Sequence, residues 1–145
     1  TQLLADSRLP GMKVLEFAFD SREPSNYLPH RYIRNCICYS GTHDNETLAQ
    51  WLAQTSETAR AYAAEYLGLT EQGGYAWGIL RSGLASVADT FIAQLQDYLG
   101  LGAEARMNTP GTLSDRNWSW RLQPGLLTAE LAHRLRRMNT MYERL

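Results

Sequence analysis

The residues best suited to chemistry in this chain are a block of six at positions 41–46. They read Gly-Thr-His-Asp-Asn-Glu, so an imidazole and a carboxylate stand side by side at His43 and Asp44. A β-type run at 35–40 precedes the block, and a helix-type run at 47–53 follows it. In a parallel α/β sheet, the loops at the carboxyl ends of the strands build ligand and catalytic sites. The spacing therefore predicts a functional site around these two side chains.

Two roles are open for Asp44 from the residue pattern alone. An ionised carboxylate accepts hydrogen bonds from hydroxyl groups and stabilises positive charge that develops on a substrate. Aspartate is also a common N-cap, and a helix is expected to begin near Glu46. His43 also has two possible roles, as a donor to a ligand or as a hydrogen-bonded polar residue without a function. For a lone histidine at a strand end, the second role is the more common.

A second polar stretch, at 104–112, follows the third predicted strand. Arg106 can pair with a carboxylate there, and the amide of Asn108 offers both a donor and an acceptor. The alternative is that both residues only fix the loop around a proline and a glycine. Trp118 and Trp120 come next. They point opposite ways if the chain is extended, so at most one of them can face a cleft and stack on a ligand. Core packing is expected for both, because large aromatic side chains are mostly buried.

A long connection at 20–34 joins the first two predicted strands. Its fifteen residues lack helical periodicity, and loops of this length are often functional. Tyr27 and His30 are its candidates for contact with a ligand. The alternative is that the Tyr-Leu-Pro sequence simply folds the loop.

Strand and helix patterns alternate along the chain. Strands are expected at 12–19, 35–40 and 90–96, and helices at 46–66, 75–88 and 127–142. Ser56 is expected to cap a second segment of the first helix, which breaks near Thr55. This alternation favours an α/β fold with a parallel sheet. Three strands are too few for an eight-stranded barrel, which takes about 250 residues, so the chain is expected to be the C-terminal part of a larger enzyme.

Composition and charge exclude several classes of protein. The chain has 145 residues, 44% of them hydrophobic, which is enough for one folded domain. The net charge is −1, and the basic residues are spread along the chain, so a nucleic-acid partner is not expected. Neither a membrane span nor a signal segment is visible, so we expect no membrane partner and a cytoplasmic location.

Two further groups of residues have structural interpretations. Cys36 and Cys38 point to one face of a strand, and we expect them to be buried, reduced thiols, since two cysteines alone make a poor metal site. Arg134, Arg137 and Arg144 are expected to lie on the solvated face of the last helix.

Six blocks of sequence occur in an order and spacing that resemble a known family. The blocks lie at 11–19, 27–30, 41–45, 96–101, 106–111 and 117–121. Together they resemble the last third of the 4-α-glucanotransferases, also called amylomaltases or disproportionating enzymes, of glycoside hydrolase family 77. The resemblance covers nearly the whole chain. It departs at 114–116, where many relatives carry glycine before Asn117.

This resemblance implies that residues 1–145 form the C-terminal portion of a catalytic (β/α)8 TIM-barrel domain, consisting of its last three βα units. The implied enzyme transfers α-1,4-glucan segments between maltooligosaccharides by a retaining mechanism, with no cofactor and no metal. That mechanism uses a nucleophile and a general acid/base about 5 Å apart. In this family both lie upstream of Thr1, so the chain alone is expected to be inactive and to need the rest of the barrel.

The resemblance also implies roles for individual residues. Asp44 corresponds to a third catalytic carboxylate, which holds the sugar hydroxyls, and His43 donates to the sugar in the same subsite. The other expected substrate contacts are Arg106, Asn108, Tyr27 and His30. Glu16 and Asp20 fall outside the implied catalytic set. Two alternatives are a fragment of a retaining α-glucan hydrolase and a free-standing carbohydrate-binding or interaction module.

Overall fold

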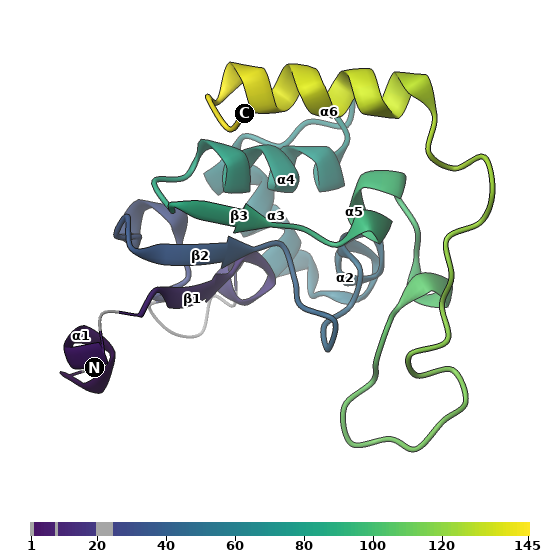
Figure 1. Ribbon diagram of the computed structural model, residues 1–145, viewed down its shortest axis with the longest axis horizontal. Coiled ribbons are helices and arrows are strands. Elements are labelled where there is room, and N and C mark those ends of the chain that lie inside the picture. The colour runs from purple at the N-terminus through teal and green to yellow at the C-terminus, as the bar shows by residue number, and fades with distance from the viewer. Residues whose placement is uncertain (1, 8, 20–24) are drawn as a thin grey trace.

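The centre of the fold is a sheet of three parallel strands in the order β1, β2, β3 (Figure 1). The computed structural model describes residues 2–7, 9–19 and 25–145. The strands are β1 (Gly11–Val14), β2 (Cys36–Tyr39) and β3 (Thr90–Ile92). Because parallel strands end at the same edge, the segments that follow them are brought together. The predicted α/β fold with a parallel sheet is confirmed.

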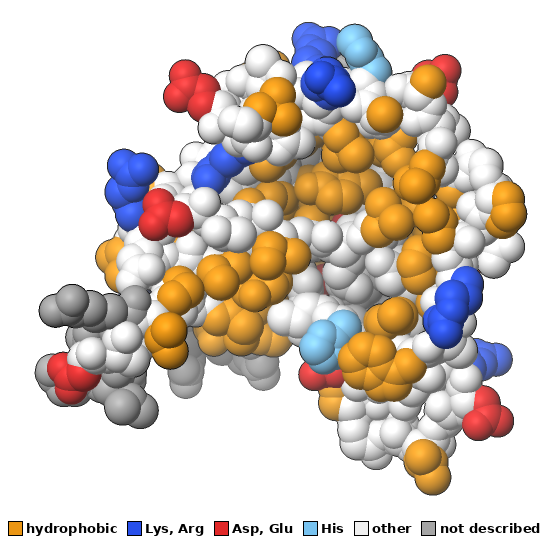
Figure 2. Space-filling view, viewed as in Figure 1, with side chains coloured by type: hydrophobic (Ala, Val, Ile, Leu, Met, Phe, Trp, Pro, Cys, Tyr) orange, Lys and Arg blue, Asp and Glu red, His pale blue; other side chains and the backbone are white. Residues whose placement is uncertain are grey.

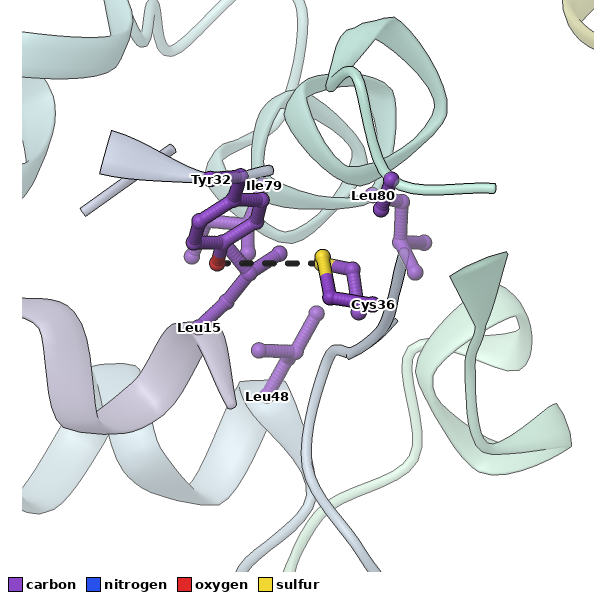
Figure 3. Close-up of a cluster of buried hydrophobic side chains, with 8 residues drawn as sticks. Leu15, Tyr32, Cys36, Leu48, Ile79 and Leu80 are labelled. Carbon is purple, nitrogen blue, oxygen red and sulfur yellow. Dashed lines mark hydrogen bonds between the residues drawn. The ribbon is translucent and has the colours of Figure 1, made fainter. Parts of the chain in front are cut away.

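Alternation along β2 gives the sheet two different faces. Cys36 and Cys38 are buried and free, as predicted, and they pack against helices in a core that includes Leu48 and Leu80 (Figure 3). The Cys38 thiol donates a hydrogen bond of 3.8 Å to the Tyr32 hydroxyl. On this side the helices exclude water from the sheet.

The other face of the sheet is less covered. Met12 pairs in register with Ile37, which in turn pairs with Thr90. Met12 is 57% exposed and Ile92 is 45% exposed, and Figure 2 shows hydrophobic side chains gathered over the strands. This face can pack against further structure.

Three helices connect β2 to β3. They are α2 (Leu48–Gln54), α3 (Glu57–Leu67) and α4 (Tyr75–Ala85). The break between the first two falls where the sequence predicts it, and the hydroxyl of Ser56 accepts from the Ala59 amide at 3.1 Å. The predicted cap is therefore confirmed.

The structure corrects the ends of two predicted strands. β1 stops at Val14, and the 3₁₀ helix η1 (Leu15–Phe19) replaces its second half. This turn lets Ala18 and Phe19 pack against Ala63 of α3 in a second core cluster. β3 stops at Ile92, and the short helix α5 (Leu95–Leu99) follows.

The connections also differ from three regular βα units. Among the described residues, only η1 and the 3₁₀ helix η2 (Pro29–Arg31) lie between β1 and β2. An unpredicted helix, α1 (Gln2–Ser7), precedes β1, and the 3₁₀ helix η3 (Ala103–Ala105) follows α5. Asp20 lies outside the described residues.

The last helix, α6 (Ala129–Met141), lies beside α4 (Figure 1). The prediction of solvated arginines holds for Arg134 and Arg137, which are exposed, and is wrong for Arg144. Arg144 follows α6, and its guanidinium donates to the carbonyls of Leu84, Ser86 and Ala88 at 2.7 to 3.0 Å. Arg134 stacks on the indole of Trp77, 3.5 Å from the ring centroid. In the part of the chain that the structure describes, no helix has the length and apolar character needed to cross a bilayer.

Candidate active site

The predicted site lies in a tight turn at the carboxyl end of β2. Asn45 holds the turn closed, because its side-chain oxygen accepts from both the amide and the hydroxyl of Thr42, at 2.9 and 2.7 Å. The backbone is thereby fixed between these two residues. The side chains of His43 and Asp44 keep 56% and 47% of their surface exposed, so both are open to a ligand.

Asp44 is held from two sides. The Asn108 amide donates to its Oδ1 atom at 2.6 Å, and Nε2 of His43 lies 3.4 Å from the same oxygen. The helix-cap alternative is wrong, because the N-cap of α2 is Thr47, whose hydroxyl accepts from the Gln50 amide at 3.2 Å. The Asp44 carboxylate therefore has no part in capping α2.

Arg106 ties the second polar stretch to the turn. Its guanidinium donates to Oε1 of Glu46 and to the backbone carbonyl of Asp44, both at 2.8 Å. A third bond of 2.9 Å reaches the backbone carbonyl of Asn108. The sequence predicts that this arginine meets a carboxylate, but it does not single out Glu46 as the partner.

His43 also contacts Trp118, with the ring centroids 5.0 Å apart. The prediction that this tryptophan packs in the core is wrong, because it is 53% exposed, whereas Trp120 is partly buried. The Trp118 backbone has a φ of 63°, and its amide donates to the Met107 carbonyl at 2.7 Å. This unusual backbone conformation turns the indole toward the histidine instead of into the core.

Asp97 supports the site from within the protein. It is fully buried, and it accepts from the Ser40 hydroxyl at 2.6 Å and from the Leu48 amide at 2.8 Å. Burial raises the pKa of this carboxyl, while the two hydrogen bonds lower it. Asp97 thus joins the end of β2 to the start of α2. No role for Asp97 is predicted from the sequence, although its place just after the third predicted strand is a usable signal.

Glu16 is a second buried carboxyl behind the turn. It is 6% exposed, and among the described residues neither of its carboxyl oxygens has a hydrogen-bond partner. Burial, with added repulsion from Asp97 and Glu46, raises its pKa to about 9, so it is protonated at neutral pH. A side chain at Gly41 would come within 2.9 Å of the carboxyl oxygens, so glycine permits this close approach.

Tyr27 and His30 are not brought to this cluster. His30 is hydrogen bonded through Nδ1 to the Tyr66 hydroxyl at 2.8 Å, and the Tyr27 ring packs edge-on against Phe17 at 5.6 Å. Neither residue has a described contact with Asp44; the Tyr27 carbonyl accepts from the Tyr32 hydroxyl at 2.8 Å, and the Lys13 ammonium lies 5.8 Å from the centroid of the Tyr27 ring. The structure thus unites His43, Asp44, Arg106 and Asn108, and it leaves the two loop residues apart.

The chemistry of the cluster suits a polar ligand rich in hydroxyl groups. A carboxylate accepts hydrogen bonds, an imidazole donates or accepts them, and an indole face offers apolar contact. Among the described residues, no group of three or more histidine, cysteine, aspartate or glutamate side chains is arranged to hold a metal ion. The fold and site define an α/β protein with a carboxylate-containing site at the carboxyl edge of a parallel sheet.

Comparison with known proteins gives the family. Residues 1–128 match the profile of glycoside hydrolase family 77, described as 4-α-glucanotransferase, and the chain belongs to this family. It is 47% identical to the 4-α-glucanotransferase of Clostridium butyricum, covering 93% of this chain and 28% of that protein. Identity to the Thermus thermophilus 4-α-glucanotransferase is 44%, covering 94% of this chain and 29% of that protein.

A solved structure is similar over nearly the whole chain. The amylomaltase from Streptococcus agalactiae in complex with acarbose is 38% identical and superposes with a TM-score of 0.93, covering 99% of this chain and 29% of that one. The chain spans less than a third of the length of these relatives.

Proposed function

We propose that this chain is the C-terminal part of the (β/α)8 barrel of a retaining 4-α-glucanotransferase, which moves α-1,4-glucan segments between maltooligosaccharides. Family membership supports the activity, and the position of Asp44 supports the site. Its half-exposed carboxylate stands at the carboxyl edge of the sheet, where barrel enzymes carry their catalytic groups. The less covered face of the sheet would pack against the remaining strands of the barrel.

In this proposal Asp44 binds sugar hydroxyls and stabilises the positive charge that develops on the ring in the transition state. His43 donates to the same sugar, and Trp118 offers its exposed indole face beside it. Arg106 and Asn108 line the floor of the site and fix the position of Asp44. Tyr27 and His30 contact the glucan only if it extends over the 25–35 loop.

The other two catalytic carboxyls would come from strands outside this chain. A retaining mechanism needs a nucleophile and a general acid/base. Of the four carboxyls that the structure describes at this edge, three already have structural roles or are buried. Glu46 pairs with Arg106, Asp97 is hydrogen bonded, and Glu16 is buried. Among the described carboxylates at this edge, only that of Asp44 is half-exposed and has no arginine partner, which supports a site completed by other strands.

Maltotriose provides the test. The full-length enzyme is expected to yield glucose together with oligosaccharides longer than maltotriose, and the 145-residue chain alone is expected to yield neither. Glucose and maltose as the only products of the full-length enzyme would indicate a hydrolase. Turnover by the purified chain that no contaminant explains would contradict the proposed division of the site.

A further inference from the structure

A groove between α4 and α6 lies among the outer helices and shares no residue with the site around Asp44. The two helices run side by side (Figure 1). Residues of the turn between α3 and α4 line one side of the groove. Its volume is about 350 Å³. Sites for small molecules start at roughly 300 Å³, so the groove can hold a compact ligand.

The charge of the groove is of one sign. Arg81 of α4 and Arg134 and Arg137 of α6 line it, and among the described residues no aspartate or glutamate does. Burial, and then the charge of Arg81, lower the pKa of Arg134. Like charges gathered around one hollow repel each other, and an anion bound between them would relieve that repulsion.

One of these arginines is held in place by the helix beside it. The guanidinium of Arg134 stacks 3.5 Å from the centroid of the Trp77 ring. Stacking uses the face of the guanidinium and leaves the N–H groups at its edge available as donors. The side chain is therefore ordered before any anion arrives, which reduces the entropy lost on binding.

The first turn of α4 adds backbone donors at the same groove. The N-cap of this 11-residue helix is Gly74, with a φ of 78° and no side chain that could accept from the first-turn amides. Gly74 and Trp77 both line the groove. The start of a helix carries a partial positive charge and N–H groups that bind anions. The three arginines and the start of α4 thus both favour an anionic ligand.

We propose that this groove is a binding site for a small organic phosphate of about the size of a sugar phosphate. Arginine pairs with phosphate oxygens through two parallel hydrogen bonds. Three arginines supply enough positive charge and enough N–H donors to bind a doubly charged phosphate group. Met138 and Leu69 give an apolar wall to the carrier. The volume of about 350 Å³ fits a small molecule better than an acidic peptide segment. This site is additional to the proposed glucan site.

Calorimetric titration of the full-length protein at low salt tests the proposal. The probes are glucose 1-phosphate and inorganic pyrophosphate. Arg81→Gln and Arg137→Gln keep most of the side-chain length, and each is expected to weaken binding by about tenfold or more. Arg136→Gln is the matched control, because Arg136 is exposed on the same helix and does not line the groove. Circular dichroism checks that every variant is folded.

Three results would overturn the proposal. The first is the absence of binding for both probes. The second is binding that survives in the Arg81→Gln/Arg137→Gln double variant, or that falls equally in Arg136→Gln, since the anion would then lie elsewhere or be held by net charge alone. The third is tighter binding of a hexaglutamate peptide than of either phosphate. Because the readout is binding, the result does not depend on glucan transfer.

Discussion

The side-chain amide of Asn108 donates a 2.6 Å hydrogen bond to the carboxylate of Asp44, from a residue 64 positions further along the chain. The bond joins the loop after α5 to the turn after β2. It leaves the second oxygen of Asp44 to accept from a ligand. A hydrogen bond to a charged acceptor is stronger than one to a neutral acceptor, so Asn108 is well placed to orient the carboxylate.

Replacing Asn108 therefore affects turnover through the orientation of Asp44. Asn108→Ala in the full-length enzyme is expected to lower kcat about tenfold or more, since a hydrogen bond to a charged group contributes roughly 1.5–3 kcal/mol. Steady-state kinetics with maltotriose measure this. Asn139→Ala is the control, because the Asn139 side-chain amide donates within α6, to the Leu135 carbonyl. Equal kcat values in the two variants would refute the orienting role.

Glu16 gives the 145-residue chain a pH-dependent stability. Its pKa is raised from about 4.5 to about 9, so between these values the folded state keeps a proton that the unfolded state loses. The contribution of Glu16 to stability is thus fully present below pH 4.5 and falls as pH rises toward 9. The free energy of unfolding is expected to fall by at most about 1.4 kcal/mol per pH unit because of this one group.

Glu16→Gln keeps the side chain neutral at every pH, so the variant is expected to lack this slope. Urea unfolding from pH 5 to pH 8 should show the variant gaining stability over the wild type as pH rises. Glu65→Gln, an exposed substitution on α3, should behave like the wild type. A difference in the free energy of unfolding between Glu16→Gln and wild type that stays constant with pH would mean that Glu16 is ionised in the folded chain.

Arg144 joins the last helix to the end of α4. Its guanidinium donates to four carbonyls there, those of Leu84, Ser86, Ala88 and Asp89, at 2.7 to 3.4 Å. Arg144→Ala leaves these acceptors without their partner and should lower the free energy of unfolding by about 1–3 kcal/mol. Thermal unfolding of the variant measures the loss. Arg136→Ala, at an exposed position, should change the melting temperature little. Equal melting temperatures for the two variants would mean that the hydrogen bonds of Arg144 do not stabilise the fold.

Local patterns in the sequence account for the elements that were predicted well. β2 alternates buried and half-buried residues, and Ser56 starts α3 with an ordinary cap. Both signals act within a few residues. The position of His43 and Asp44 after a strand was also readable, because a parallel sheet gathers such segments at one edge.

Long-range packing decides the features that were missed. Leu15–Phe19 has apolar residues suited to a strand, yet its buried side chains reach α3 only if the backbone turns. Trp118 is exposed because its backbone conformation turns it toward His43. Arg144 is half-buried because its guanidinium donates to backbone carbonyls at the end of α4. None of these partners is near in sequence, so no local pattern could reveal them.

The most direct test of the proposed function is the kcat and melting temperature of Asp44→Asn in the full-length enzyme. This change keeps the size of the side chain and removes its charge, so kcat should fall roughly 100-fold or more. The melting temperature should hardly change, because Thr47 and not Asp44 caps α2. Thr47→Ala is the converse control, with a loss of about 1 kcal/mol in stability and near-normal kcat. Near-normal kcat in Asp44→Asn together with a clear drop in melting temperature would contradict the catalytic role of Asp44.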